Sequence, residues 1–283
     1  MIRLFAALLS VVTLSVSLPA KQQPVFVARR DVVRLDVLVT ERGRAVLGLT
    51  ANDFTVVDNG VPQRVDFVSF DELPLNVMLT FDASASMAGP QFDDLRSAGH
   101  AILDLLRKDD RAALVSFSHE VLLRSDLTFD REAVGTALAA RSTGGQTALI
   151  DASFAGLALG GSEAGRSVMF AFSDGRDTSS WLEPQRVIDF AKAANVAVFG
   201  VTSSGSRNSF LKDLVNVTGG DLVQVQSTRE LKPVFVRLLA EFRLRYTVGY
   251  SPTGVSSGGW HALKVSTSRK GATIKARDGY QGG

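Results

Sequence analysis

The sequence predicts an α/β protein in which a doubly wound, mostly parallel sheet is inserted between β-rich segments at the two ends of the chain. In the middle, short continuous apolar runs alternate with segments of helical periodicity, the pattern of strands buried on both faces of a parallel sheet. Toward both ends, apolar and polar residues alternate instead, which indicates half-buried antiparallel strands. Of the 283 residues, 45% are hydrophobic and 21% are charged. The chain is therefore long and apolar enough to bury a large core.

The central segment, residues 73–242, is predicted to contain about six strands and six helices. Its first strand, Leu75–Phe81, follows a proline and ends at a cluster of small polar residues. Val168–Phe172 is a second apolar run of the same kind. The other predicted strands are 112–117, 121–124, 196–201 and 222–225, and the predicted helices are 92–106, 131–140, 148–159, 184–194, 210–217 and 230–241.

The flanking segments are residues 24–72 and 243–283. Val32–Val39 alternates as VVRLDVLV, and Asp58-Asn59-Gly60 is a hairpin signal that precedes another predicted strand. At the other end, residues 243–249, 260–267 and 273–277 alternate in the same way. Each segment has too few strands for a stable domain, so we expect the two to form one small β-sandwich. Two separate β-rich flanks, or strands that add to an edge of the central sheet, are the alternatives.

Residues 1–20 have the features of a secretory signal peptide. Arg3 is followed by a serine-containing apolar run from Leu4 to Leu18, which is shorter than a typical transmembrane helix. This pattern predicts a secreted or periplasmic protein with no membrane span after signal removal, and an uncleaved anchor is the alternative. The chain contains no cysteine, which excludes a cysteine-linked lipid anchor and a disulfide framework.

The charge of the chain gives no indication of a nucleic-acid partner. The formal net charge is only +2, and the lysines and arginines do not form a polybasic run. A nucleic-acid-binding domain would be expected to concentrate its positive charge on one face or one helix.

Small polar residues gather where three predicted loops meet the central sheet. Asp82, Ser84 and Ser86 follow the first buried strand, Thr147 precedes a helix, and Asp174 follows a second buried strand. In open α/β sheets ligands bind at the carboxyl ends of the strands, so we expect these residues to share one site. The set offers only oxygen ligands and only two carboxylates. It suits a small hard cation that keeps some of its water, Mg²⁺ in the first place, with Mn²⁺ or Ca²⁺ as alternatives.

This arrangement resembles the metal-ion-dependent adhesion site of the von Willebrand factor type A domain, which is written D-x-S-x-S, then a distant Thr, then a distant Asp. Residues 82–86, Thr147 and Asp174 match that pattern in order, and Ala85 stands where the family commonly has glycine. The chain as a whole resembles bacterial secreted proteins that carry such a domain between β-rich flanks.

The resemblance implies a Rossmann-like domain over residues 73–242 and a bound divalent cation. It also implies a role in adhesion or protein–protein interaction. In the family one or both aspartates bind the metal through water, so the cation stays electrophilic. An acidic side chain supplied by a protein partner then completes the coordination.

Each of these residues also has a simpler interpretation. Ser84, Ser86 and Thr147 are good helix-capping residues, and Asp174 begins an ordinary Asp-Gly turn. A metal at the site could also serve only to stabilise the loops, which would make the protein a structural scaffold. Two residues beyond the match are ambiguous: Asp177 either shapes the rim of the site or is a solvated loop charge, and Trp181 is either a partner contact or a packed loop residue.

A hydrolase is the less favoured alternative. The chain has no G-x-S-x-G motif, and none of its three histidines, His100, His119 and His261, is predicted to lie at the site. Walker-type glycine spacing is also absent. We therefore predict a protein that is not an enzyme, with no catalytic residue and no site for an organic cofactor.

Overall fold

The computed structural model describes residues 32–140, 143–161, 165–206 and 208–283. The predicted signal peptide, residues 1–20, lies outside these ranges. In the described part of the chain no helix combines the length and the apolar character needed to cross a membrane.

The strands are β1 (Val33–Glu41), β2 (Arg44–Ala45), β3 (Phe54–Asp58), β4 (Val61–Gln63), β5 (Val65–Phe70), β6 (Leu75–Asp82), β7 (Arg111–Phe117), β8 (Val121–Thr128), β9 (Arg166–Ser173), β10 (Val196–Ser203), β11 (Asp221–Val225), β12 (Tyr246–Tyr250), β13 (Gly259–Thr267), β14 (Thr273–Lys275) and β15 (Gly279–Gly282). The helices are α1 (Pro90–Asp104), α2 (Arg131–Ala139), α3 (Leu149–Gly161), α4 (Pro184–Ala193), α5 (Ser209–Thr218) and α6 (Leu231–Arg243), with short 3-10 turns at Ala51–Asp53, Ala85–Met87 and Thr228–Glu230.

The central sheet has the strand order β11-β10-β9-β6-β7-β8. The first five strands run parallel, and β8 pairs antiparallel with β7, so the sheet is mixed. β6 and β9 lie side by side in the middle, and every residue of both strands is buried. Their continuous apolar sequences follow from this position, because helices cover both faces of the sheet.

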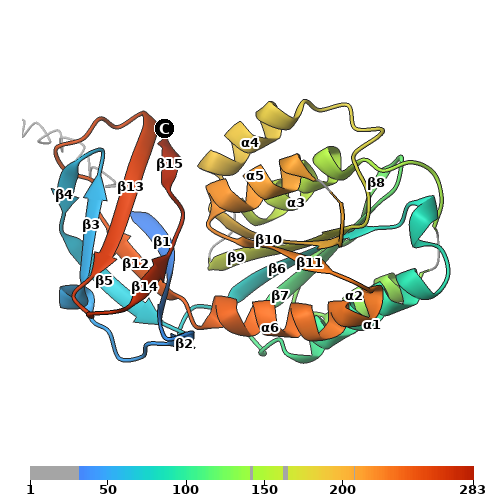
Figure 1. Cartoon of the computed structure of the whole chain (residues 1–283), viewed down its shortest axis with the longest axis horizontal. Coiled ribbons are helices and arrows are strands. Elements are labelled where there is room, and N and C mark those ends of the chain that lie inside the picture. Colours follow the sequence, from blue (N-terminus) through green and yellow to red (C-terminus); the bar gives the residue numbers. More distant parts are fainter. Residues whose placement is uncertain (1–31, 141–142, 162–164, 207) are drawn as a thin grey trace, which may run out of the picture. The chain divides into compact units, whose positions relative to one another are not determined.

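Helices α1, α2 and α6 cover one face of the sheet, and α3, α4 and α5 cover the other (Figure 1). Alternate residues of each strand contribute to the two cores. Phe81 of β6 packs with Phe170 of β9 and Phe235 of α6 on one face, whereas Met78 belongs to the core on the opposite face. The ring centroid of Phe235 lies 5.8 Å from that of Phe81 and 5.7 Å from that of Phe170. The sequence prediction of an α/β fold is thus confirmed.

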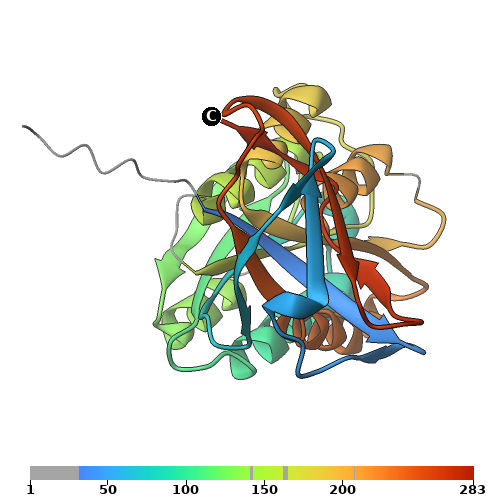
Figure 2. The same cartoon turned by 90° about the vertical axis from the view of Figure 1, so that its left-hand side faces the viewer.

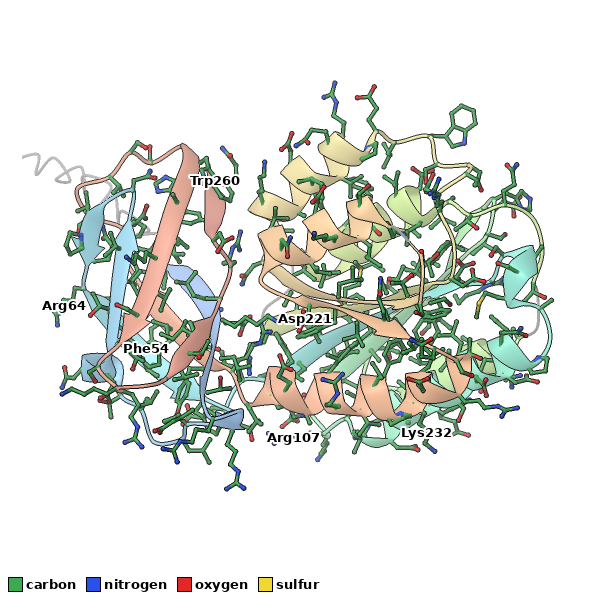
Figure 3. All side chains as sticks on the ribbon, in the orientation of Figure 1. Phe54, Arg64, Arg107, Asp221, Lys232 and Trp260 are labelled. Atoms are coloured by element: carbon green, nitrogen blue, oxygen red, sulfur yellow. The ribbon has the colours of Figure 1, made fainter. Side chains whose placement is uncertain are left out.

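Strands from the two ends of the chain pair with each other. β1 pairs antiparallel with β12, and β3 pairs antiparallel with β13. One sheet has the order β14-β1-β12-β5, with β2 beside β1, and a second has the order β15-β13-β3-β4. Figure 2 shows the blue N-terminal and red C-terminal strands interleaved. Residues of both sheets, among them Val37, Phe54 and Tyr246, share one apolar core (Figure 3).

The end of α6 differs from the sequence prediction. A strand was expected from residue 243, but the helix continues to Arg243 and β12 begins only at Tyr246. The cause is burial: Phe242 is fully buried against the central sheet, so the last helical turn is stabilised by packing that periodicity alone does not show. The sequence analysis also missed β15, a strand of only four residues rich in glycine.

A buried ion pair joins β1 to β9. The Arg166 guanidinium donates to the Asp36 carboxylate at 2.7 Å and to the carbonyl oxygen of Phe242 at 2.8 Å. Only 4% of the Arg166 side chain and 18% of the Asp36 side chain are exposed. Burial lowers the pKa of Arg245 and lowers that of Arg277 to about 10, while the charge of Asp36 opposes both shifts. Asp36 is therefore the ion-pair partner of Arg166, and its charge also favours the protonated forms of Arg245 and Arg277.

Truncation of Phe235 to alanine should destabilise the central domain by about 3–5 kcal/mol, because it removes a fully buried ring that contacts two other phenylalanines. Denaturant unfolding followed by circular dichroism measures this loss. Lys232→Ala is the matched control, since Lys232 is an exposed residue of the same helix (Figure 3), and it should change stability by less than about 0.5 kcal/mol. Equal effects of the two substitutions would contradict the packing described for α6.

Replacement of Asp36 by alanine should cost about 3 kcal/mol of unfolding free energy, because Arg166 would keep a buried charge without its carboxylate. Glu41→Ala provides the control on the same strand. Its pair with Arg269, at 3.0 Å, is 34% and 55% exposed, so its loss should cost less than about 1 kcal/mol. A stability for Asp36→Ala equal to that of Glu41→Ala would show that the β1–β9 ion pair contributes little.

Candidate functional site

Asp82 is the last residue of the central strand β6, at the carboxyl edge of the sheet. Its side chain is fully buried. The Ser84 amide donates to one carboxylate oxygen at 2.8 Å, and the Ser173 hydroxyl donates to the other at 2.7 Å. Ser173 ends the neighbouring strand β9, so the parallel pairing of β6 with β9 places this hydroxyl beside the carboxylate.

The loop after β6 carries the two serines of the motif. The hydroxyls of Ser84 and Ser86 lie 3.1 Å apart, and Ser86 donates a hydrogen bond of 2.9 Å to the Asp174 carboxylate. Ser84 is buried, Asp174 is half-buried and Ser86 is exposed. The four residues from Asp82 to Asp174 thus form a hydrogen-bonded series that runs from the buried end of the strand to the surface.

A glycine loop holds the serine loop from the other side. The Gly144 amide donates to the carbonyl oxygen of Ala83 at 2.9 Å, and the Ala85 amide donates to that of Gly145 at 3.2 Å. Gly145 has a φ of 76°, a conformation that favours glycine. A side chain at this position would also collide with the imidazole of His119, which lies against it. The glycine therefore permits the close approach of the two loops.

Thr147 follows this glycine loop and is buried just before α3. Its amide donates to the Thr178 hydroxyl at 3.0 Å, and its carbonyl oxygen accepts from the amides of Thr178 and Ser179 at 2.8 and 3.2 Å. Thr147 is thereby fixed to the loop that begins at Asp174. Asp82 at the end of β6 and the other four predicted residues, on loops hydrogen-bonded to one another, thus lie at one edge of the sheet.

Two further carboxylates hold the loop between β9 and α4 against α3. Asp177 accepts from the amide of Ile150 at 2.9 Å and from the hydroxyl of Ser180, so it is a loop-fixing residue and not a solvated charge. Asp151 accepts from the amides of Trp181 and Leu182, both at 2.9 Å. Trp181 itself is 94% exposed, which excludes the packed interpretation of this residue.

The electrostatics of the site favour an added positive charge. Burial raises the pKa of the Asp82 carboxyl above its usual value, hydrogen bonds from Ser84 and Ser173 oppose this rise, and the charge of Asp174 adds to it. Within the described residues neither Asp82 nor Asp174 forms an ion pair with a lysine or arginine. Two carboxylates without a cationic partner, next to three hydroxyls, fit the ligand preference of a hard divalent cation.

The donor set has a further consequence for the kind of metal. Across the part of the chain that is described, no three histidine, cysteine, aspartate or glutamate side chains converge on a common point. At the candidate site the two carboxylates of Asp82 and Asp174 lie among hydroxyl oxygens. Such a set has few charged ligands, and water or an outside ligand would complete the coordination of a hard divalent cation bound there.

The histidines are distributed as follows. His100 is exposed on α1, and His261 is buried in the β-rich part, where its Nδ1 lies 2.8 Å from the Asp58 carboxylate. His119 lies near the candidate site, because it packs on Gly145, a position the sequence analysis did not foresee. Ser173 and Asp151 were also missed. Ser173 directly precedes Asp174, and this adjacency was the one available signal, whereas the contacts of Asp151 depend on the tertiary fold.

Comparison with solved structures supports the fold. A von Willebrand factor type A protein from Catenulispora acidiphila is similar with a TM-score of 0.56 at 14% sequence identity, over 82% of this chain and 74% of that one. Proximal thread matrix protein 1 from the mussel byssus, in a structure described as having a zinc-occupied MIDAS motif, has a TM-score of 0.55 at 18% identity, over 65% of this chain and 49% of that one. At these identities the likeness concerns the fold alone.

Sequence comparison identifies the family. An uncharacterized protein, sll0103, from Synechocystis sp. (strain ATCC 27184 / PCC 6803 / Kazusa) is 30% identical over 113 residues, which are 37% of this chain and 26% of that protein. The chain thus matches about a quarter of the length of that curated relative. The sequence model of the von Willebrand factor type A domain matches residues 76–236. Because this match spans more than half of the 283 residues, the chain belongs to the von Willebrand factor type A domain family.

Proposed function

We propose that this protein binds a divalent cation through Asp82, Ser84, Ser86, Thr147 and Asp174 and uses the metal to bind a partner protein. Mg²⁺ is the proposed ion, with Mn²⁺ and Ca²⁺ as alternatives that oxygen ligands also accept. The partner supplies an acidic side chain to the metal. Membership of the family supports this proposal, since its domains typically mediate protein–protein interactions.

The observation that carries the proposal is the hydrogen-bonded series from the buried Asp82 to the surface at Ser86 and Asp174. Its oxygen atoms already lie close together, so a cation would need little rearrangement of the loops. Ser86 in this series is exposed, which leaves one side open to a ligand from solvent. The zinc-occupied MIDAS motif reported for the mussel protein is consistent with a metal at this edge of the fold.

The chemistry of the site favours binding over catalysis. A cation held by hydroxyls and two carboxylates would be an electrophile that attracts a carboxylate from a partner. We propose that the protein is not an enzyme and is secreted or periplasmic.

We further propose the following division of the chain: a signal peptide at 1–20, the type A domain at 73–242, and one small β-sandwich formed by 24–72 and 243–283. The pairing of β1 with β12 and of β3 with β13 supports the sandwich.

Calorimetric titration of Mg²⁺ and Mn²⁺ should show one binding site in the mature protein and none in Asp82→Ala. Ser86→Ala should weaken the affinity by at least the roughly 10–100-fold that loss of an outer-shell partner costs, because a hydroxyl ligand is removed. Since Ser86 is exposed, this variant should keep its fold even if Asp82→Ala does not. Asp66→Asn, which changes an exposed acid hydrogen-bonded to Ser251 in the β-rich part, should bind the ions like the original protein. Absence of binding to the original protein would exclude the metal site.

Selection of displayed random peptides tests the partner chemistry. On the original protein in Mg²⁺ the selected sequences should be enriched in Asp or Glu, and a chelator should release them, because their carboxylate completes the coordination of the metal. Ser86→Ala should select few such peptides at the same Mg²⁺ concentration. A protein that binds Mg²⁺, melts at a higher temperature with it and selects no acidic peptides would instead be a scaffold with a stabilising metal.

A further inference from the structure

We propose that Trp181 is a second contact point for the partner and that it selects partners in which an apolar side chain lies near the metal-binding acid. This inference rests on the function proposed above and makes it more specific. It is carried by three features of the loop between β9 and α4: the exposure of the indole, the way its backbone is held, and the attachment of the same loop to the metal-site residues.

The exposure of Trp181 is unusual for its size. The side chain is 94% exposed, whereas the other tryptophan, Trp260, is 41% exposed and has Lys192 over its ring. A large aromatic surface in water is unfavourable, and aromatic residues are enriched at the centres of protein interfaces because burial against a partner recovers this loss. The neighbouring Leu182 is 37% exposed and adds to the apolar surface.

The backbone that carries the indole is fixed in place. Asp151, in the first turn of α3, accepts both the Trp181 and the Leu182 amide at 2.9 Å. The Ser180 hydroxyl donates to Asp177, and its oxygen accepts from the Asp151 amide at 3.1 Å. An exposed aromatic on a restrained backbone loses less conformational entropy on binding than one on a free loop.

The same loop also holds the candidate metal residues. It begins at Asp174, whose carboxylate accepts from Ser86, and its Thr178 and Ser179 amides donate to the carbonyl oxygen of Thr147. The metal site and the indole are therefore parts of one hydrogen-bonded unit formed by this loop and the start of α3. A partner that places an acid at these residues binds beside the loop that carries Trp181.

The exposed surface at Trp181 favours an apolar partner side chain over a cationic one. An indole face attracts both kinds of group. Leu182, 37% exposed beside the indole, extends the apolar surface, and the carboxylates of Asp151 and Asp177 already accept hydrogen bonds from backbone amides and from Ser180, so the surface offered to a partner here is mainly apolar. The proposed partner is thus a protein segment with an acidic residue and, near it, an aliphatic or aromatic residue.

A display library with one fixed Asp and random neighbours, selected in Mg²⁺, tests this proposal. The original protein should enrich an apolar residue at a constant spacing from the Asp. A synthetic peptide with that sequence should bind Trp181→Ala about tenfold or more weakly, whereas Trp181→Phe should retain most of the affinity. Mg²⁺ affinity should be the same in all three proteins. Phe129→Ala should bind normally, because Phe129 is 62% exposed but follows β8 at the opposite edge of the sheet.

A double-mutant cycle separates recognition from a general effect on the loop. Replacing the apolar residue of the peptide by glycine should cost the original protein about tenfold in affinity and cost Trp181→Ala almost nothing, since the two changes remove the same contact. Asp151→Ala, which frees the Trp181 and Leu182 amides, should weaken binding of the apolar peptide. Mg²⁺-dependent acidic peptides that bind Trp181→Ala as well as the original protein would overturn the role of Trp181 and leave the proposed function standing. A selection that does not depend on Mg²⁺ would overturn both.

Discussion

The carboxylate of Asp82 is the group around which the carboxyl edge of the central sheet is arranged. It is fully buried at the end of β6 and accepts hydrogen bonds from an uncharged amide and an uncharged hydroxyl. A buried charge held in this way is costly unless its oxygens are fully satisfied. This requirement orders the serine loop and the end of β9, which both donate hydrogen bonds to Asp82. Ser86 of the serine loop in turn positions the side chain of Asp174. The positive charge of a metal ion would remove the remaining cost.

The acidic residues near this edge divide into two groups. Asp151 and Asp177 have their oxygens occupied by backbone amides and a serine hydroxyl, and they fix the shape of the loop between β9 and α4. Asp82 and Asp174 hydrogen-bond to hydroxyls and, for Asp82, one amide, and they lie within the cluster of hydroxyl oxygens. The first group supplies rigidity and the second supplies charge. This division explains how the loop can display an exposed tryptophan without losing its conformation.

The two ends of the chain form a β-rich part that is connected to the central domain by more than the polypeptide. Arg166 of β9 is held by Asp36 of β1 and by the last turn of α6, and its guanidinium lies 4.5 Å from the centre of the Phe242 ring. These contacts restrain α6, because loss of Asp36 would leave the Arg166 guanidinium charged and buried without its carboxylate. The burial of Phe242, beside Arg166, is what extends α6 to Arg243.

The sequence alone determined the α/β class, most element positions and the match to the site motif, because apolar periodicity and the D-x-S-x-S pattern are local properties of the chain. It did not reveal the contacts of Ser173, Asp151 and His119, or the exposure of Trp181. Each of these depends on which strands and loops become neighbours, as when β9 brings Ser173 to Asp82 and α3 brings Asp151 to the Trp181 amide. The two additional residues at the end of α6 were likewise decided by packing, since burial of Phe242 against the sheet stabilises them and local propensity does not.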